Sequence, residues 1–207
     1  MDGDEEISII YYSLIIPIIM KNYILIKLYL LIILITINTA CTDKGHGNEQ
    51  ELITTLIYSL NQIGPSTDSV IMTFRDLDGE GGNPPSITVS GPLKANSAYQ
   101  ATLKLLNESV TPSTDITEDI RKEGTSHQFF FSKNGTLNIT TSYTDTDSNG
   151  RPIGISSAII ASGPSSGKII ITLRHEPNKS ATGVSNGDIT NAGGETDIEV
   201  SFDVEIK

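Results

Sequence analysis

The chain contains no tryptophan and a single cysteine, Cys41, among its 207 residues. One cysteine excludes an internal disulfide, so noncovalent contacts must hold the fold together. Basic residues are also scarce: 14 Lys and Arg stand against 25 Asp and Glu, a formal net charge of -11. This charge argues against nucleic acid as a partner, because nucleic-acid-binding surfaces are basic. Long charged helical stretches are missing too, and the abundant Gly, Ser, Thr and Asn suit short strands joined by turns.

The longest apolar run lies near the N-terminus and has the layout of a secretory signal peptide. From Met20 onward, two lysines precede an almost entirely apolar stretch, and small residues follow it, so we predict a signal peptide at residues 20–40. Residues 1–19 begin with the acidic MDGDEE, and we interpret them as a mis-called extension upstream of the true start. A transmembrane helix between residues 7 and 37 is the alternative, although polar residues interrupt the roughly 20 apolar residues that a span needs.

The lone cysteine directly follows this apolar run. The sequence NTAC at residues 38–41 resembles a bacterial lipobox, in which small residues precede a cysteine that is lipidated and becomes the new N-terminus. Asn38 stands where that motif prefers an aliphatic residue, and a free thiol or an ordinary signal peptide is the alternative. Acyl chains on Cys41 would anchor the protein, because each buried methylene contributes about 0.8 kcal/mol. We expect residues 41–51 to form a flexible tether and the protein to lie in the cell envelope on the outer membrane, facing either the periplasm or the surface.

From residue 52 onward the sequence has the period of β-strands. Apolar residues alternate with polar ones over residues 99–105 and again over residues 198–206. Seven further short segments continue the pattern: ELITTLIYSL, DSVIMTFRD, PSITVSG, SHQFFFS, TLNITTSYTD, IGISSAIIAS and GKIIITLRH. One short helix is predicted at STDITEDIRKEG, which has a Ser or Thr cap, acids in its first turn, bases in its last and Gly124 at its end. We therefore predict an all-β fold over residues 52–207, an antiparallel β-sandwich of immunoglobulin-like character whose helix bridges two sheets.

Five segments together resemble a family of small lipoproteins of the Bacteroidota. They are FRDLDGEGG, TEDIRKEGTSHQFFF, YTDTDSNGRPIG, LRHEPNKS and GGETDIEVSFDVEI. Members often carry the name "type 1 periplasmic binding fold superfamily protein", and the resemblance covers nearly all of the chain after Cys41. It implies an envelope lipoprotein without an established activity. The fold in that name has two doubly wound α/β lobes, whereas this sequence has almost no helical pattern, so the β-sandwich prediction is retained.

Two acidic loops carry oxygen donors at alternate positions before glycines. The donors are Asp76, Asp78 and Glu80 in the first loop and Asp145, Asp147 and Asn149 in the second. Alternating oxygens in a Gly-containing turn can wrap a hard cation such as Ca²⁺. The alternative is ordinary turn formation, because Asp, Asn and Gly are the usual residues of hairpin turns.

The three histidines are the remaining candidate ligands. His46 lies in the tether, where we expect it to be solvated. With a period of two, His127 shares a strand face with Phe129, while His175 ends an apolar strand and precedes Glu176. If the fold brings His127, His175 and Glu176 together, they can bind Zn²⁺ or Cu²⁺. The alternative is a pair of histidines that are satisfied by hydrogen bonds.

The sequence gives little support for catalysis, since we identify no G-x-S-x-G nucleophile elbow, no H-E-x-x-H motif and no Walker-type phosphate-binding loop. We therefore predict a non-enzymatic protein: a membrane-anchored lipoprotein that binds a metal ion or small ligand, as an accessory to an outer-membrane transporter. Its contact with the bilayer would be the acylated Cys41. The alternative is a structural or interaction lipoprotein that contacts a membrane-protein partner without a ligand of its own.

Overall fold

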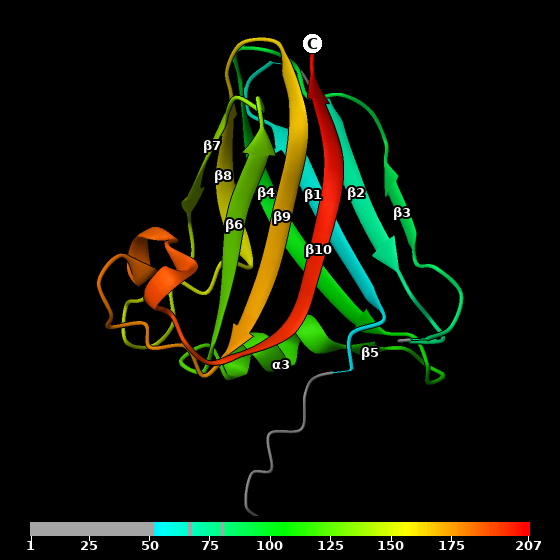
Figure 1. Ribbon diagram of the computed structural model, residues 1–207, viewed down its shortest axis with the longest axis vertical. Helices are drawn as coiled ribbons and strands as arrows, with labels where there is room; N and C mark the ends of the chain where they lie inside the picture. Colours follow the sequence, from blue (N-terminus) through cyan, green and yellow to red (C-terminus); the bar gives the residue numbers. More distant parts are fainter. Residues whose placement is uncertain (1–51, 66–67, 80) are drawn as a thin grey trace, which may run out of the picture. The chain divides into compact units, whose positions relative to one another are not determined.

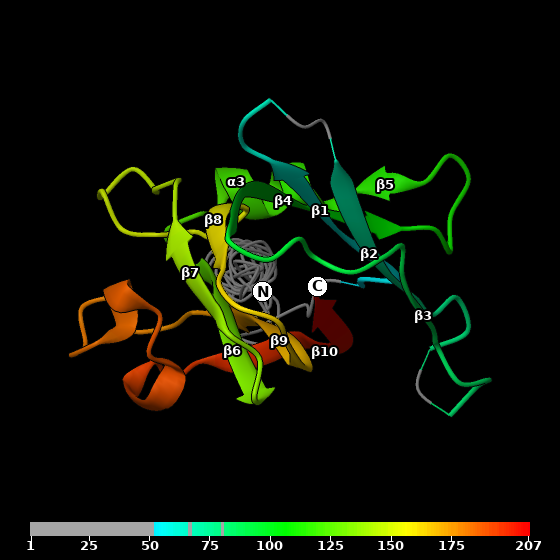
Figure 2. The ribbon, with the colours of Figure 1, turned by 90° about the horizontal axis from the view of Figure 1, so that it is seen from above.

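Two antiparallel β-sheets pack face to face and enclose the hydrophobic core, as seen from the side in Figure 1 and from above in Figure 2. The computed structural model describes residues 52–65, 68–79 and 81–207. The predictions for residues 1–51, including the signal peptide, Cys41, His46 and the tether, lie outside the described residues, as does Glu80. Among the residues that are described, no helix has the length and apolar character needed to cross a bilayer.

The larger sheet has seven strands in the order β3-β2-β1-β4-β8-β7, with the short β5 beside β4. These strands are β1 (Thr55–Gln62), β2 (Ser69–Arg75), β3 (Ser86–Val89), β4 (Ser97–Asn107), β5 (Thr114–Asp115), β7 (Ile139–Tyr143) and β8 (Ser156–Ala161). Alternation along each strand decides which side chains are buried. In β4, Tyr99, Ala101, Leu103 and Leu105 are all buried in the core. This confirms that the segment is a strand, as its period of two predicted.

The smaller sheet has three strands in the order β10-β9-β6. They are β6 (His127–Gly135), β9 (Ser165–His175) and β10 (Glu195–Ile206). Its inner face contributes a row of buried apolar side chains from β9 and another from β10, including Leu173 and Phe202. On its outer face, Phe130 packs with Val184 and Ala192 from the segment between β9 and β10. That segment contains two short 3₁₀ helices, η2 (Val184–Asn186) and η3 (Ile189–Asn191).

The α-helix connects the two sheets. Helix α3 (Ile116–Lys122) follows β5 of the larger sheet and leads into β6 of the smaller one, as the sequence predicted. Its N-cap is Asp115, whose carboxylate accepts the N–H of Thr117, and not the Ser or Thr that was predicted. The described residues confirm the predicted all-β antiparallel sandwich with one short α-helix, and the two-residue β5 adds to the nine strands expected.

The strand register places the residues that carry the candidate chemistry together at one end of the smaller sheet. This is the end beside α3 in Figure 1. His127 is the first residue of β6 and pairs with His175, the last residue of β9. His175 pairs in turn with Glu195, the first residue of β10. Three strand ends that are distant in sequence therefore meet in one row.

Candidate metal centre

His127 and His175 lie side by side on neighbouring strands. Their ring centroids are 4.7 Å apart and the rings are tilted by 32°. Both rings continue inward-facing rows, because His127 lies two residues before the buried Phe129 and His175 two residues after the buried Leu173. His127 is fully buried, and the side chain of His175 is 16% exposed. The structure thus brings together the two histidines that the sequence analysis selected.

Asp197 completes a group of three ligands, and a β-bulge directs it there. Strict alternation places Asp197 on the outer face of β10, because Ile198 is one of the inward residues. The register between β10 and β9 shifts between Thr196 and Ile198, and the extra residue turns Asp197 toward the histidines. Its Oδ2 lies 3.7 Å from Nε2 of His127, and its Oδ1 lies 3.9 Å from Nδ1 of His175. Only 1% of the Asp197 side chain is exposed.

Each member of this group has a buried polar atom without a hydrogen-bond partner. These atoms are Nε2 of His127, Nδ1 of His175 and Oδ2 of Asp197. The ligand atoms of the three residues all lie within 4.8 Å of one another. Buried polar atoms in folded proteins are nearly always paired. Three such atoms on three neighbouring potential ligands therefore indicate a site for a cation.

The protonation states of the group follow from its neighbours. Nδ1 of His127 lies 3.2 Å from the carbonyl oxygen of Glu123, which only accepts, so Nδ1 carries the proton and Nε2 presents a lone pair toward Asp197. Burial lowers the pKa of His127, so its ring is neutral at pH 7, although the Glu123 carbonyl opposes this shift. Burial raises the pKa of Asp197 to about 6. At pH 7 an ionised carboxylate thus faces an imidazole lone pair, and a cation between them removes the repulsion.

Two imidazoles and one carboxylate suit a borderline transition metal. Tetrahedral Zn²⁺ binds such ligands at about 2.0–2.2 Å, which places the ligand atoms about 3.3 Å from one another. The 3.7 and 3.9 Å separations, to the two different oxygens of Asp197, and the 4.8 Å limit for the whole group are longer than this value, so the side chains would rotate inward to close the site around an ion. The hydrogen bond of His127 to the Glu123 carbonyl is the usual outer-shell contact of a metal-binding histidine. Ca²⁺ takes six to eight oxygen ligands, so the imidazoles disfavour it here.

Glu176, the third ligand that the sequence suggested, lies outside this group. It is exposed, its φ is 50°, and its backbone N–H donates to the carbonyl of Ser126 at 2.6 Å. Asp197 takes its place. Sequence reasoning missed Asp197 because the alternation of β10 assigned it to the solvent face, and the bulge leaves no local signal in the sequence.

The first acidic loop uses its carboxylates to form a turn. Asp76 accepts the backbone N–H of Gly79 at 2.9 Å, and Asp78 accepts the backbone and side-chain N–H groups of Asn83. These contacts are those of ordinary turn formation, the alternative interpretation. A calcium site in this loop stays a prediction.

The second acidic loop already binds a cation of the protein itself. Asp145 accepts two backbone N–H groups from the chain that leads into β8. Asp147 accepts two backbone N–H groups of its own loop and binds Nζ of Lys179 at 3.0 Å, while Asn149 is exposed. The predicted calcium ligands of this loop therefore hold the turn and the buried ammonium of Lys179.

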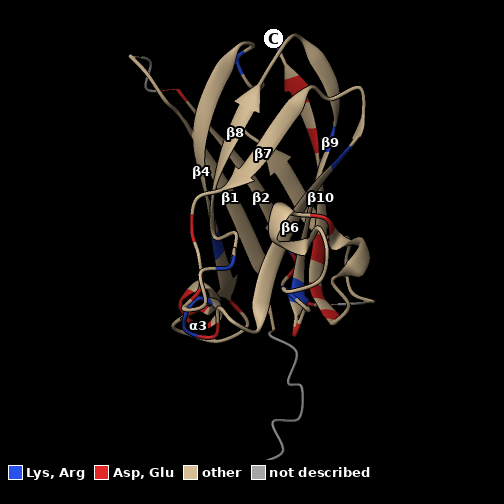
Figure 3. Ribbon diagram, turned by 90° about the vertical axis from the view of Figure 1, so that its left-hand side faces the viewer, with Lys and Arg blue, Asp and Glu red and all other residues tan. Residues whose placement is uncertain are grey.

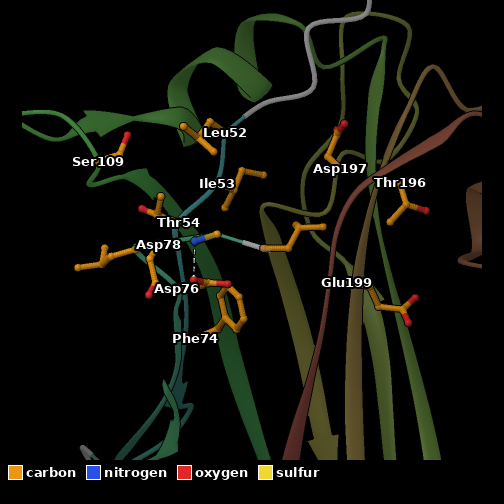
Figure 4. Close-up of a pocket in the computed structure, with 13 residues that line it drawn as sticks. Leu52, Ile53, Thr54, Phe74, Asp76, Asp78, Ser109, Thr196, Asp197 and Glu199 are labelled. Carbon is orange, nitrogen blue, oxygen red and sulfur yellow. Dashed lines mark hydrogen bonds between the residues drawn. The ribbon is translucent and has the colours of Figure 1, made fainter. Parts of the chain in front are cut away.

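A pocket of about 660 Å³ adjoins the three-residue group (Figure 4). One wall is formed by the chain before β1 and the end of β2, with Ile53, Phe74 and Asp76. The opposite wall is β10, with Asp197 and Ile198. None of the described residues that line this pocket is Lys or Arg. Asp197 therefore belongs both to an acidic pocket and to the candidate metal centre.

The sequence does contain one match to the G-x-S-x-G pattern of serine hydrolases, GPSSG at residues 163–167, so the prediction that this motif is absent is wrong as to the pattern. The structure places it at the turn between two strands, β8 and β9, whereas a nucleophile elbow joins a strand to a helix. The Ser165 hydroxyl donates to the carbonyl of Gly163 and accepts the N–H of Asn138. Ser165 and His175 also lie at opposite ends of β9, so this motif forms no catalytic pair with that histidine.

Comparisons of the chain with protein-family models, with curated proteins and with solved structures gave no match. The resemblance to the Bacteroidota lipoprotein family therefore stays a prediction. Any functional assignment rests on the geometry of the three-residue group and on its surroundings.

Proposed function

We propose that this domain is a non-catalytic binding module for one transition-metal ion, Zn²⁺ or Cu²⁺, held by His127, His175 and Asp197. The observation that carries the proposal is the grouping of three residues whose ligand atoms lie within 4.8 Å of one another and each of which has a buried, unpaired polar atom. Histidines of a purely structural pair would have these atoms satisfied by protein groups. The contact from the Glu123 carbonyl adds support, because it fixes the tautomer of His127 that can bind a metal through Nε2.

Removing one ligand should weaken Zn²⁺ binding by at least about 100-fold, because even outer-shell changes cost 10- to 100-fold in affinity. The purified full chain would be titrated with Zn²⁺ against a competing chelator, with His175→Ala and Asp197→Asn beside the wild type. The visible spectrum of bound Co²⁺ gives a second readout, since it reports the geometry and type of the ligands. Retention of a 1:1 complex with wild-type affinity in both variants would exclude this ligand set.

His46→Ala is the matched control for this titration, because it removes an imidazole from the predicted tether and leaves the three-residue group intact. It should bind Zn²⁺ as the wild type does. If His46→Ala loses binding to the same extent as His175→Ala, the tether holds the ion and the proposal is wrong. Failure of the wild type to bind Zn²⁺ or Cu²⁺ would reject the proposed function altogether.

We further propose that the domain works outside the cytoplasm, attached to the outer membrane through an acylated Cys41, as an accessory to an outer-membrane transporter. The apolar run before NTAC and the polar tether after it support this part of the proposal. Cells that express the full chain and are fed an alkyne-labelled fatty acid should label the protein. Cys41→Ser should abolish the label, whereas Thr42→Ser at the next position should keep it. Label that survives Cys41→Ser would disprove the anchor.

A further inference from the structure

We infer that the pocket beside β10 is the access route by which a metal cation reaches the three-residue group. This inference rests on the proposed function and specifies how the ion arrives. Of the three ligands, Asp197 alone also lines the pocket. Its side chain is almost completely buried and its Oδ2 has no hydrogen-bond partner. The route therefore ends at a carboxylate that is available to take the ion.

The charge of the pocket favours a cation. Asp76 and Asp78 lie together on one side of the pocket, and Asp197 of β10 lies on the other (Figure 4). Hydrogen bonds from the backbone and side chain of Asn83 lower the pKa of Asp78, so that it is ionised at neutral pH. Strand β10 itself carries acidic residues along its length and no Lys or Arg (Figure 3).

The apolar side chains of the pocket lining strengthen the electric field of the pocket carboxylates. Ile53, Phe74 and Ile198 place hydrocarbon beside the carboxylates. Acidic clefts with low-dielectric walls focus the electric field and raise the local concentration of cations. An inorganic cation is therefore the occupant that the pocket attracts on its way to Asp197, and basic residues that would repel it do not occur among the described lining residues.

The competing route is the partly exposed edge of His175. Its side chain is accessible to solvent, while those of His127 and Asp197 are buried. A cation that arrived there would meet an imidazole first and would not pass the pocket acids. The two routes therefore differ in which surface charges control the rate of association.

The rate of Zn²⁺ association separates the two routes. Stopped-flow mixing of the full chain with Zn²⁺, read out with a chromophoric chelator, would compare the wild type with the double variant Asp76→Asn, Asp78→Asn. Both substitutions keep an acceptor oxygen for the present partner, the backbone N–H of Gly79 or of Asn83. We expect association to be about fivefold slower at low ionic strength and less dependent on salt, with dissociation unchanged.

Two controls test whether position or only net charge matters. Asp203→Asn with Glu205→Gln removes the same amount of negative charge from exposed positions of β10 outside the pocket, and should leave the rate unchanged. Leu77→Lys adds a positive charge on the pocket lining and should slow association, whereas Ile160→Lys on β8 should not. The side chains of Leu77 and Ile160 are both exposed, so neither substitution disturbs the core.

Each outcome decides the inference. Equal slowing in the pocket variants and in the controls would reduce the effect to net charge and overturn the route. Unchanged rates in both pocket variants would assign the route to the edge of His175. If the wild type takes up no Zn²⁺, the proposed function fails and the inference fails with it, a result distinct from any change in rate.

Discussion

Replacing Lys179 with methionine should destabilise the domain by about 3–5 kcal/mol. Lys179 is only 5% exposed. Its ammonium donates three hydrogen bonds: to Oδ2 of Asp147 at 3.0 Å, to the carbonyl of Pro152 at 2.8 Å and to the carbonyl of Gly124. An ammonium has three N–H donors, so all of them are satisfied. Methionine has a similar length but no charge, and it would leave the buried carboxylate of Asp147 without a counter-ion.

Three acceptors around Nζ of Lys179, one of them the Asp147 carboxylate, indicate an ion pair between these two residues. Burial lowers the pKa of Lys179, and Asp147 opposes that shift. Burial alone would raise the pKa of Asp147, but hydrogen bonds from the backbone of Arg151 and from Lys179 outweigh it, and the pKa lies below its usual value. Removing one partner of a buried pair leaves the other charge unpaired, so the loss exceeds that expected for a surface pair.

Urea denaturation of the two lysine variants measures this difference. Lys168→Met breaks the pair between Lys168 Nζ and Asp203 Oδ1, which are 2.7 Å apart but whose side chains are 40% and 84% exposed. This control should cost about 0–1 kcal/mol. The double variant Lys179→Met, Asp147→Asn should recover part of the loss, because a neutral amide needs no counter-ion. Equal losses from Lys179→Met and Lys168→Met would show that the Lys179 pair is not buried in solution.

Lys179 also joins three segments around the candidate metal centre. Gly124 belongs to the turn after α3, Asp147 to the loop between β7 and β8, and Lys179 itself to the segment after β9. Gly124 directly follows Glu123, whose carbonyl oxygen contacts Nδ1 of His127. The loop that the sequence suggested as a calcium site thus supports, through Lys179, the turn that fixes the tautomer of His127.

The strands were predictable because one-sided burial imposes a period of two on the sequence. Residues 99–105 and 198–206 show that period clearly, and their inward members are buried or packed against the core as expected. The same period placed His127 and His175 on inward faces. Their adjacency was not predictable, because strand order and register depend on pairing between segments that are distant in the sequence.

Asp197 and Lys179 show what a local pattern cannot supply. Asp197 breaks the alternation of its strand only because a bulge adds one residue to β10, and the bulge is defined by its pairing with β9. Lys179 stands in the polar stretch HEPNKS, where a lysine is expected in solvent, yet its ammonium pairs with a carboxylate 32 residues away. Both placements depend on the backbone of another segment.

In the metal-free protein, Asp197→Asn should increase stability above about pH 7 and have little effect below about pH 4. Burial raises the pKa of Asp197 from 3.8 to about 6, and the attraction from His175 opposes this only in part. A raised pKa means that the folded state binds the proton more tightly than the unfolded state. The contribution of the protonated group is therefore fully present below pH 3.8 and is lost as the pH rises through 6. A shift of this size corresponds to about 3 kcal/mol.

Urea denaturation in EDTA between pH 4 and pH 8 checks this prediction, with Asp203→Asn as the exposed control on the same strand. Asparagine carries no charge at any pH in this range, so the variant avoids the cost of burying a carboxylate beside His127 and Glu195. An Asp197→Asn protein that is less stable than the wild type at pH 8 would contradict the prediction. Added Zn²⁺ should reverse the order by stabilising the wild type more than the variant, because an ion that binds only the folded state adds its binding free energy to stability. A carboxylate that weakens the metal-free fold and strengthens the metal-bound one acts as a ligand, since a merely structural group would gain nothing from the ion.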